Sequence, residues 1–254
     1  MKHRAAQGIM PQPATSSLSA EDIQGRVLFR DGLVIALNKP SGMPVHAGFG
    51  GGPNLEESFT HLTFGLPRPP SLGHRLDRDT SGCLVLGRHR KALQKLSKLF
   101  AGGRVRKTYW AIVHGAPKRA EGRIDLALKK IGRGPGWKMK GDRSGQAALT
   151  NYKVCGSFKT ARGLQTWLEL QPHTGRTHQL RVHCAALGCP IVGDHVYGSG
   201  PRRETETLML HARGLSLPLY PKRKPIEVTA PPPEHMLEAL MACGFVYETP
   251  SPGP

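Results

Sequence analysis

The chain has 254 residues, enough for one large domain or two small ones with a sizeable core. Its 36 Lys and Arg residues outnumber 18 Asp and Glu residues, and the resulting formal net charge of +18 favours a polyanionic partner, either nucleic acid or an anionic membrane. No apolar run approaches the roughly 18 residues of a membrane-spanning helix, and the N-terminal segment lacks the apolar stretch of a signal peptide. We therefore expect a soluble, cytoplasmic protein without a membrane partner.

The five cysteines are odd in number, widely spread and never spaced as C-x-x-C. This spacing argues against a disulfide framework and against a zinc knuckle, so reduced and mostly packed thiols are expected.

Residues 1–20 and 249–254 are polar or Pro-rich and lack periodicity, as is typical of flexible tails. No linker and no internal repeat divides residues 21–248, where we expect a single domain. That domain opens with predicted strands at 27–29 and 33–37, which are joined by an Asp-Gly turn. The glycine-rich segment that follows lacks the lysine of a phosphate-binding P-loop and is interpreted as a mobile loop over residues 48–55.

After a short predicted strand at 83–88, residues 89–100 change to helical spacing. Apolar residues form one stripe of this predicted helix and three lysines occupy another face: Lys91, Lys95 and Lys98. Most lysine stripes are solvated surfaces. Residues 88–143, however, hold 17 Lys and Arg residues against three acids, a clustering that favours contact with phosphates.

Further along the chain, residues 106–115 alternate as a strand, with Tyr109, Ala111 and Val113 predicted on one face and Trp110 and Ile112 on the other. The basic, glycine-rich stretch 129–146 has no period and predicts a long exposed loop. A strand is expected at 164–172, and Thr177 is the expected N-cap of the next helix. Two strands and a short final helix complete a mixture that favours an α+β fold.

Few carboxylates are available for catalysis in so basic a protein, and two of them lie in "GHRLDRDTSG", residues 73–82. If this segment is extended, Asp77 and Asp79 point to the same side, and Arg75 and Arg78 keep them ionised. An Arg–Asp network that only stabilises a turn is the alternative interpretation.

Two further features favour a functional role for this segment. Tyr109 offers a flat face on which a base could stack, although most buried tyrosines are core residues. The run "TGRTHQLRVH" carries Arg176 and Arg181 where a loop turns into a helix, a place where arginine often binds anions or pairs with carboxylates.

Three segments, "HRLDRDTSG" (74–82), "RKTYWAIVHG" (106–115) and "HTGRTHQLRVH" (173–183), together resemble the hallmark motifs of the RluA family of pseudouridine synthases. The similarity extends over most of the chain, from "LNKPSGMPVHAG" to "LHARGLSLPL". It implies the α+β pseudouridine synthase fold, a bent, mixed, mostly antiparallel sheet with flanking helices and loops and a catalytic cleft across its middle.

The resemblance also implies a role for each matching residue. Asp77 matches the essential aspartate of the family, and Tyr109 matches the aromatic residue that stacks on the target uracil. Arg181 matches the basic residue paired with the aspartate, and Leu180 beside it packs on the base. Arg75 matches the arginine that enters the RNA helix as the base leaves, and Arg176 is a further candidate for substrate binding.

The implied reaction moves C1′ of a uridine from N1 to C5 of the same base, an isomerisation for which no cofactor and no metal is expected. Asp77 could attack the sugar, attack the base or remove a proton from C2′, and an ionised carboxylate suits each path. The base must leave its stack, at a cost of a few kcal/mol.

Many relatives carry an N-terminal S4 module, which this chain is expected to lack. This single-domain form resembles the branch that acts on stem-loops of tRNA, 23S rRNA or both, and we expect a monomer. The candidates for RNA backbone contacts are Lys91, Lys95 and Lys98 in the basic helix and Lys138 and Lys140 in the following loop.

Two other functions compete with this interpretation. One is an RNA-binding or ribosome-assembly factor without catalysis, against which the presence of Asp77, Tyr109 and Arg181 argues. The other is a metal-dependent hydrolase or deaminase that uses His173, His178 and His183. Their spacing of five residues places successive imidazoles off a common helical face, and no zinc motif accompanies them.

Overall fold

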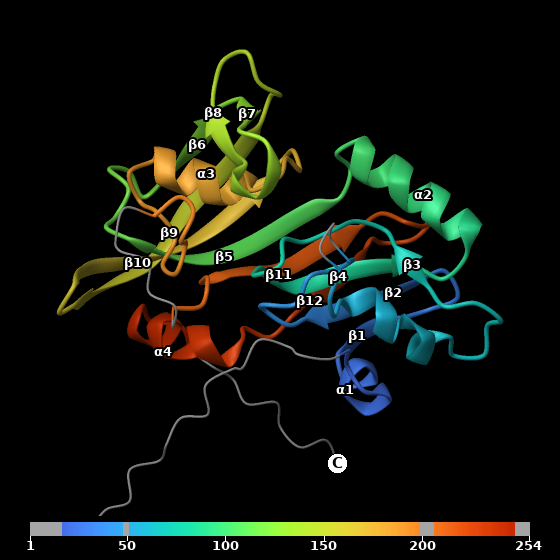
Figure 1. The fold of residues 1–254 in the computed structure, drawn as a ribbon. Helices are drawn as coiled ribbons and strands as arrows, with labels where there is room; N and C mark the ends of the chain where they lie inside the picture. The colour runs from blue at the N-terminus through green and yellow to red at the C-terminus, as the bar shows by residue number, and fades with distance from the viewer. Residues whose placement is uncertain (1–16, 48–50, 199–205, 247–254) are drawn as a thin grey trace, which may run out of the picture.

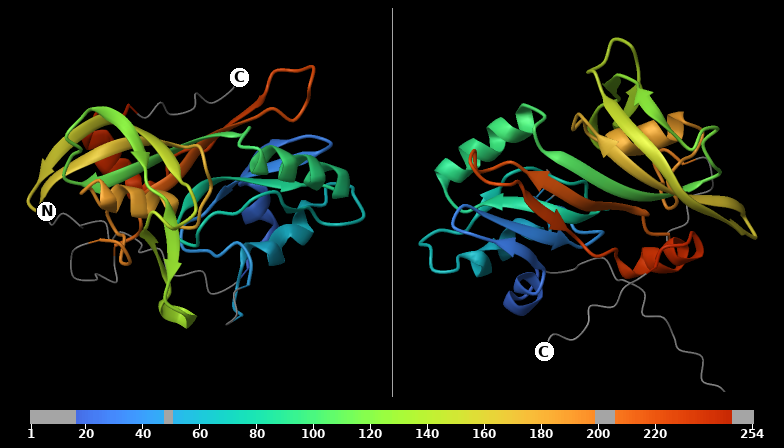
Figure 2. Two further views of the ribbon diagram at one scale, coloured as in Figure 1. Left: turned by 90° about the horizontal axis from the view of Figure 1, so that it is seen from above. Right: turned by 180° about the vertical axis from the view of Figure 1, so that it is seen from behind.

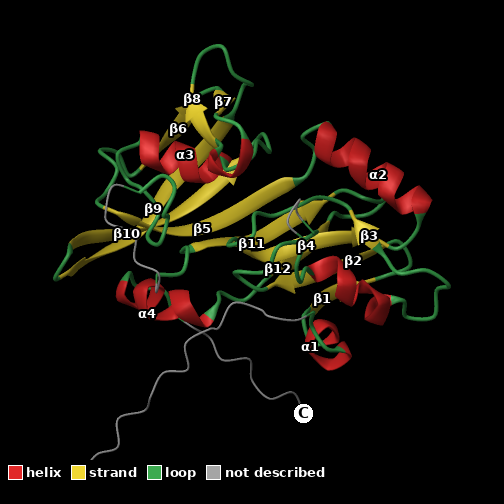
Figure 3. Ribbon diagram, in the orientation of Figure 1, coloured by secondary structure: helices red, strands yellow, loops and turns green. Residues whose placement is uncertain are grey.

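The computed structural model describes residues 17–47, 51–198 and 206–246 and has the expected α+β architecture (Figures 1 and 3). The strands are β1 (Val27–Arg30), β2 (Val34–Lys39), β3 (Ser71–Leu72), β4 (Ser81–Gly87), β5 (Arg106–His114), β6 (Glu121–Asp125), β7 (Leu128–Ile131), β8 (Lys138–Gly141), β9 (Leu149–Thr160), β10 (Gly163–Pro172), β11 (Leu210–Leu217) and β12 (Ile226–Thr229). The helices are α1 (Ala20–Gln24), α2 (Arg90–Ala101), α3 (Gln179–Ala186) and α4 (Glu234–Ala242), with 3-10 helices η1 (Leu55–Leu62) and η2 (Gly134–Gly136).

Ten of the strands form one sheet of order β1–β2–β4–β11–β5–β10–β9–β6, with β3 paired to β4 and β12 paired to β11. β4 and β11 are parallel, and the other described neighbours in this sheet are antiparallel, so the sheet is mixed and mostly antiparallel, as predicted. The sheet twists along its length (Figure 2). Most of the predicted N-terminal tail and all of the C-terminal tail lie outside the described residues.

Helices cover both sides of the sheet. Helix α2 lies over one half of one side, and α3 with the β7–β8 hairpin lies over the other half of that side, whereas α1 and α4 lie on the opposite side (Figures 1 and 2). The predicted alternation of β5 is confirmed, because Tyr109 packs toward α3 and Trp110 packs in a cluster with α4.

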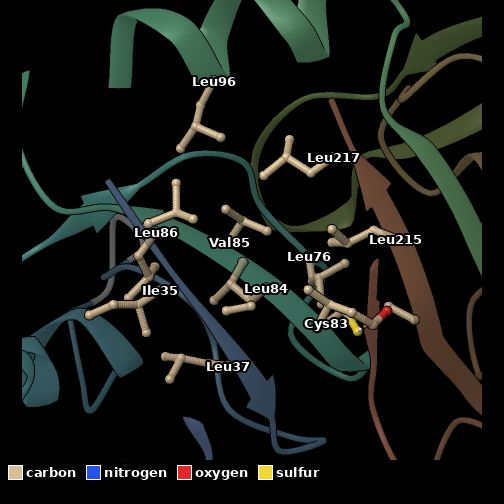
Figure 4. Close-up of a cluster of buried hydrophobic side chains, with 14 of the residues drawn as sticks. Ile35, Leu37, Leu76, Cys83, Leu84, Val85, Leu86, Leu96, Leu215 and Leu217 are labelled. Atoms are coloured by element: carbon tan, nitrogen blue, oxygen red, sulfur yellow. Dashed lines mark hydrogen bonds between the residues drawn. The ribbon is translucent and has the colours of Figure 1, made fainter. Parts of the chain in front are cut away.

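Strand β4 is buried along its whole length because it lies inside the sheet and is covered on both faces. Figure 4 shows its core cluster, in which Leu84 lies on the side of Ile35 and Leu37 of β2, whereas Val85 lies on the opposite side, toward Leu96 of α2. Leu76, which precedes β4 in sequence, belongs to the same cluster. The core therefore holds the backbone of the loop that carries Asp77.

The prediction of a long loop over residues 129–146 is wrong, since β7, η2 and β8 form a hairpin there. The period of two that is typical of a strand is present in β8 but hidden by its lysines, because Lys138 and Lys140 are exposed while Met139 packs inward. The inner face is held by Val182 of α3, which the local sequence does not reveal.

One local expectation also differs from the structure, and another falls partly outside the described residues. The N-cap of α3 is His178, in the left-handed region at φ +52°, and Thr177 lies exposed before it. Residues 48–50 of the predicted mobile loop lie outside the described residues, and η1 begins at Leu55.

Candidate active site

Asp77 lies in the loop between β3 and β4. The amide of Thr80 donates to the carbonyl of Asp77 at 3.2 Å, so residues 77–80 form a turn and not the extended segment expected for the two aspartates. As a result, the two carboxylates separate. Asp77 lines a pocket, while the Asp79 carboxylate is half exposed and lies 4.0 Å from the Arg78 guanidinium.

Close packing fixes both ends of this loop. A Cβ atom at Gly82 would lie 2.3 Å from the carbonyl oxygen of Ala212 on β11, and Gly82 has φ +104°, so only glycine fits there. At the other end, Nε2 of His74 accepts a hydrogen bond from the amide of Val85 at 3.0 Å. Burial lowers the pKa of His74 to about 4, so the ring is neutral and able to accept this bond at neutral pH.

Lys39, at the end of β2, binds the backbone of the Asp77 loop. The sequence did not identify this residue as part of the site. Its side chain is 1% exposed, and its Nζ donates to the carbonyls of Pro40, Met43 and Arg78 at 2.7, 2.7 and 2.8 Å. Because the last of these carbonyls belongs to the residue after Asp77, Lys39 ties the turn to the end of β2. The local signal in the sequence was a lysine stopping an apolar strand, which does not show that the lysine points inward.

The burial of Lys39 should make the free energy of unfolding depend on pH. Burial lowers its pKa to about 7, although the charges of Asp79 and Asp77 oppose the shift, whereas the unfolded chain titrates near 10.5. The unfolded chain therefore binds more protons between these pH values, and this group makes the free energy of unfolding rise as the pH increases from 7 to 10.5.

We expect Lys39→Met to remove this rise. Between pH 7 and 10.5 the free energy of unfolding of the wild type should therefore increase by up to several kcal/mol relative to that of the variant. Urea denaturation at pH 7, 8, 9 and 10 measures it. The exposed Lys159 provides the control variant Lys159→Met, whose curve should stay parallel to that of the wild type. A Lys39→Met curve that also stays parallel would contradict the prediction.

The pocket beside Asp77 has a volume of about 100 Å³ and is formed by the Asp77 loop, β5, the end of β10 and the start of α3. It brings together six of the residues singled out in the sequence: Arg75, Asp77, Tyr109, Arg176, Leu180 and Arg181. These residues lie up to 106 positions apart in the chain, so the sheet and α3 together create their proximity.

Arg181 differs from expectation in its partner. Among the described residues, its ion pair is with Asp194 and not with Asp77: Nε and Nη2 donate to the two carboxylate oxygens of Asp194 at 2.9 and 2.7 Å. Oδ1 of Asp194 also accepts from the amides of Val196 and Tyr197 at 3.0 Å each. The pairing with Asp77 is thus corrected, because the loop after α3 supplies a better-placed carboxylate.

The charges of Asp77, Arg181 and Asp194 shift the pKa values of groups in and beside the pocket. Burial would lower the pKa of Arg181, but the hydrogen bonds and negative charge of Asp194, with the charge of Asp77, raise it. Burial raises the pKa of Tyr109 strongly, and the negative charge of Asp77 raises it further. Tyr109 is therefore protonated at neutral pH, and Arg181 is a fixed cation near Asp77.

Gln179 organises the loop that brings Arg176 to the pocket, and it too was missed in the sequence. Its Oε1 accepts from the Thr174 hydroxyl at 2.7 Å and from the Arg176 amide at 3.0 Å. Its Nε2 donates to the Leu149 carbonyl and to the Thr150 hydroxyl at 3.0 Å each. All four hydrogen bonds of this buried amide are made, so it rigidly joins the loop to β9.

The three histidines considered as metal ligands have separate surroundings. His183 is buried, with Nδ1 2.9 Å from the Thr150 hydroxyl and Nε2 3.1 Å from the Leu126 carbonyl oxygen. Nε2 of His173 lies 3.0 Å from the Asn151 amide nitrogen, and only His178 lines the pocket. The described residues contain no group of three potential metal ligands.

The predicted lysine stripe on α2 is confirmed: Ala92, Leu96 and Leu99 are buried, while Lys91, Lys95 and Lys98 are exposed. Lys138 and Lys140 are exposed on β8. None of these five lysines lines the pocket. All five cysteines are free thiols, as expected. Within the described segments, no helix has the length and apolar character needed to span a bilayer.

Comparison with known proteins agrees with the geometry. The model of the RNA pseudouridylate synthase family matches residues 33–186, more than half of the chain. An uncharacterized RNA pseudouridine synthase of Zymomonas mobilis is 46% identical over 82% of this chain and 94% of its own length. Another from Synechocystis is 33% identical over 91% of this chain and 73% of its own length.

Solved structures lead to the same family. Human RNA pseudouridylate synthase domain containing 4 superimposes with a TM-score of 0.73 at 27% identity, covering 91% of this chain and 97% of that one. Human RNA pseudouridylate synthase domain containing 1 gives a TM-score of 0.70 at 29% identity, covering 89% of each chain. On its matched residues, its fold and its relatives, the chain belongs to the RluA-type RNA pseudouridylate synthase family and is an isomerase that acts on uridine in RNA.

Proposed function

We propose that this enzyme converts a specific uridine in a stem-loop of tRNA, 23S rRNA or both, that it flips the target base out of the RNA, and that Asp77 is its catalytic residue. One observation carries the proposal. The carboxylate in the first resembling motif, the tyrosine in the second and the arginine in the third line a single pocket.

The reaction balances without a further reactant. The bond between C1′ and N1 breaks, a bond between C1′ and C5 forms, N1 gains a proton and C5 loses one, so no electrons are exchanged with another molecule. Asp77 acts as an anion, adding to the sugar or the base or taking the C2′ proton, and Arg181, whose pKa the negative charge of Asp77 helps to raise, lines the same pocket. Because the detached uracil must rotate before C5 reaches C1′, the pocket has to hold it without a covalent tether to the sugar.

Other residues of the pocket keep the detached uracil in place. Tyr109 stacks on the uracil through its ring, and Leu180 packs against the base. Arg75 is exposed at the rim, where its guanidinium fills the space that the flipped nucleotide leaves. Filling this space offsets part of the few kcal/mol that unstacking costs. Arg176, also exposed at the rim, binds an adjacent phosphate.

We further propose that the enzyme is a monomer and acts in the cytoplasm.

Helix α2 and the β7–β8 hairpin, which carry the five candidate lysines, lie over the two halves of the same side of the sheet, where a folded RNA can contact both (Figure 1). The net charge of +18 supports a polyanion as large as a stem-loop.

The test of the function is release of tritium. RNA labelled with tritium at C5 of uridine loses the label to water when C5 bonds to C1′. Total tRNA and rRNA from cells that lack the gene should release tritium with the purified enzyme, and mapping should locate a single position or a small set. Binding of this RNA without tritium release under single-turnover conditions would instead favour the non-catalytic RNA-binding factor.

The α2 lysines predict a salt-dependent contribution to RNA affinity. Replacing Lys91, Lys95 and Lys98 by Ala should weaken binding at low salt and make the slope of log K against log salt shallower by about 2 to 3, because each phosphate contact releases about one counterion. Filter binding or fluorescence anisotropy between 50 and 300 mM salt measures the slope.

A matched control removes the same charge elsewhere. Lys118, Lys153 and Lys159 are exposed on or beside β9, which β11, β5 and β10 separate from β4 beneath α2. Their triple Ala variant should keep most of the wild-type slope. Equal slopes for both triple variants would show that the α2 lysines form a solvated surface and do not contact the RNA backbone.

A further inference from the structure

The β7–β8 hairpin has two chemically different faces. Lys138 and Lys140 point outward and are exposed. Trp137 and Met139 alternate with them and face α3, where Met139 packs in a cluster with Val182. The face that carries the lysines is therefore free to bind phosphates while the opposite face stays attached to the body of the enzyme.

The attachment ends at the wall of the pocket. The ring of Trp137 stacks on the imidazole of His178, with centroids 5.3 Å apart and planes inclined by 18°. Lys130 Nζ lies 4.7 Å from the centroid of the Trp137 ring. His178 lines the same pocket as Asp77, so only one side chain separates the hairpin from the pocket.

Tyr197 also links the hairpin to the pocket, because it contacts both β8 and His178. Its hydroxyl accepts from the amide of Met139 on β8 at 3.0 Å and lies 2.7 Å from Nδ1 of His178. Its ring lies 5.2 Å from the guanidinium carbon of Arg181, which Asp194 holds. A displacement of β8 would therefore move His178 and disturb the packing around Arg181.

His178 has an unusual backbone for such a position. It is one of two described residues other than glycine with positive φ, and its value of +52° carries a conformational cost for a residue with a Cβ atom. The stack with Trp137 and the hydrogen bond with Tyr197 hold the residue in this conformation. The cost is consistent with a functional placement, because such residues concentrate at binding and active sites.

We propose that Trp137 and His178 are positioning residues for the target base, so that RNA bound to the outer face of the β7–β8 hairpin holds the pocket wall in its reactive arrangement. This inference rests on the proposed function. It separates two roles within one element: Lys138 and Lys140 contribute affinity, whereas Trp137 acts on the chemical step through His178.

The experiment measures tritium release under single turnover as a function of enzyme concentration, with the uridine-labelled RNA described above. The maximum rate constant reports the chemical step and the half-saturating enzyme concentration reports affinity. Trp137→Ala should lower the maximum rate constant by at least about tenfold with less than about a threefold change in half-saturation. Trp137→Phe, which retains a stacking ring, should recover most of the rate.

The double variant Lys138→Ala with Lys140→Ala should show the reverse division, with half-saturation raised about tenfold and a much smaller change in the maximum rate constant. Trp137→Ala combined with His178→Asn should be no slower than the worse single variant, because the two residues act in series. Urea denaturation identifies any variant that is unfolded under the assay conditions, and the Phe variant then provides the comparison.

The inference is overturned if Trp137→Ala weakens binding alone, or if the Phe variant is as slow as the Ala variant while both are folded. A failure of the proposed function looks different, since wild-type enzyme would then release no tritium from any RNA.

Discussion

Asp77→Asn should abolish tritium release, with a loss on the order of 10³-fold or more in the single-turnover rate constant. The amide is nearly isosteric with the carboxylate but has no charge and is a poor nucleophile and base, so each of the three possible roles of Asp77 is removed together. RNA binding should persist, because removing a negative charge from the pocket does not weaken attraction to phosphates.

The neighbouring aspartate provides the control. Asp79→Asn makes the same chemical change two residues away, but the Asp79 side chain is 50% exposed and lies outside the pocket. Its rate should stay within about threefold of wild type. Wild-type turnover by Asp77→Asn would remove the residue from the mechanism, and an equal loss in both variants would indicate damage to the turn.

Asp194→Ala should cost about 3 to 5 kcal/mol of folding stability, because it leaves the Arg181 guanidinium buried without its partner. The side chains of this pair are only 7% and 0% exposed, and the variant also removes the acceptor of two backbone amides. Urea denaturation at pH 7 measures the loss. The surface pair Arg123–Asp125 has a similar N–O distance of 2.9 Å at more than 60% exposure, so Asp125→Ala should cost less than about 1 kcal/mol.

Acid should reduce the difference between wild type and Asp194→Ala. Burial alone would raise the pKa of Asp194, but the hydrogen bonds and charge of Arg181 lower it below the usual 3.8. A carboxyl with a depressed folded pKa contributes stability that is complete above its unfolded pKa and is lost as the pH falls through its folded pKa. The two stability curves should therefore converge below about pH 4, and a constant offset down to pH 2 would contradict this assignment.

Residues close together in the chain were predicted well from the sequence. The period of 3.6 placed the buried and the exposed stripes of α2, and the period of two placed Tyr109 and Trp110 on opposite faces of β5. Both patterns depend only on backbone geometry and on the transfer of apolar side chains out of water, which act over a few residues. The three motifs, in turn, contained the six candidate residues that line the pocket.

The partners of buried charges were not predicted. Arg181 was expected to pair with Asp77, but α3 and the loop after it place Asp194 at 2.7 Å. Lys39 comes shortly after the predicted strand 33–37, a position that does not reveal its burial among three carbonyls. The desolvation of a charge must be offset by whichever partner the packed fold brings within hydrogen-bond reach, and separation along the chain does not determine that distance.

The sequence by itself thus determined six of the residues that line the site, the basic character of the chain and the family. Only the tertiary structure decided that Asp77 sits on a turn, that Asp194 holds Arg181, and that the basic segment 129–146 is a hairpin stacked on the pocket wall. The physical reason is common to all three, because each depends on contacts between segments that only the assembled sheet and α3 bring together.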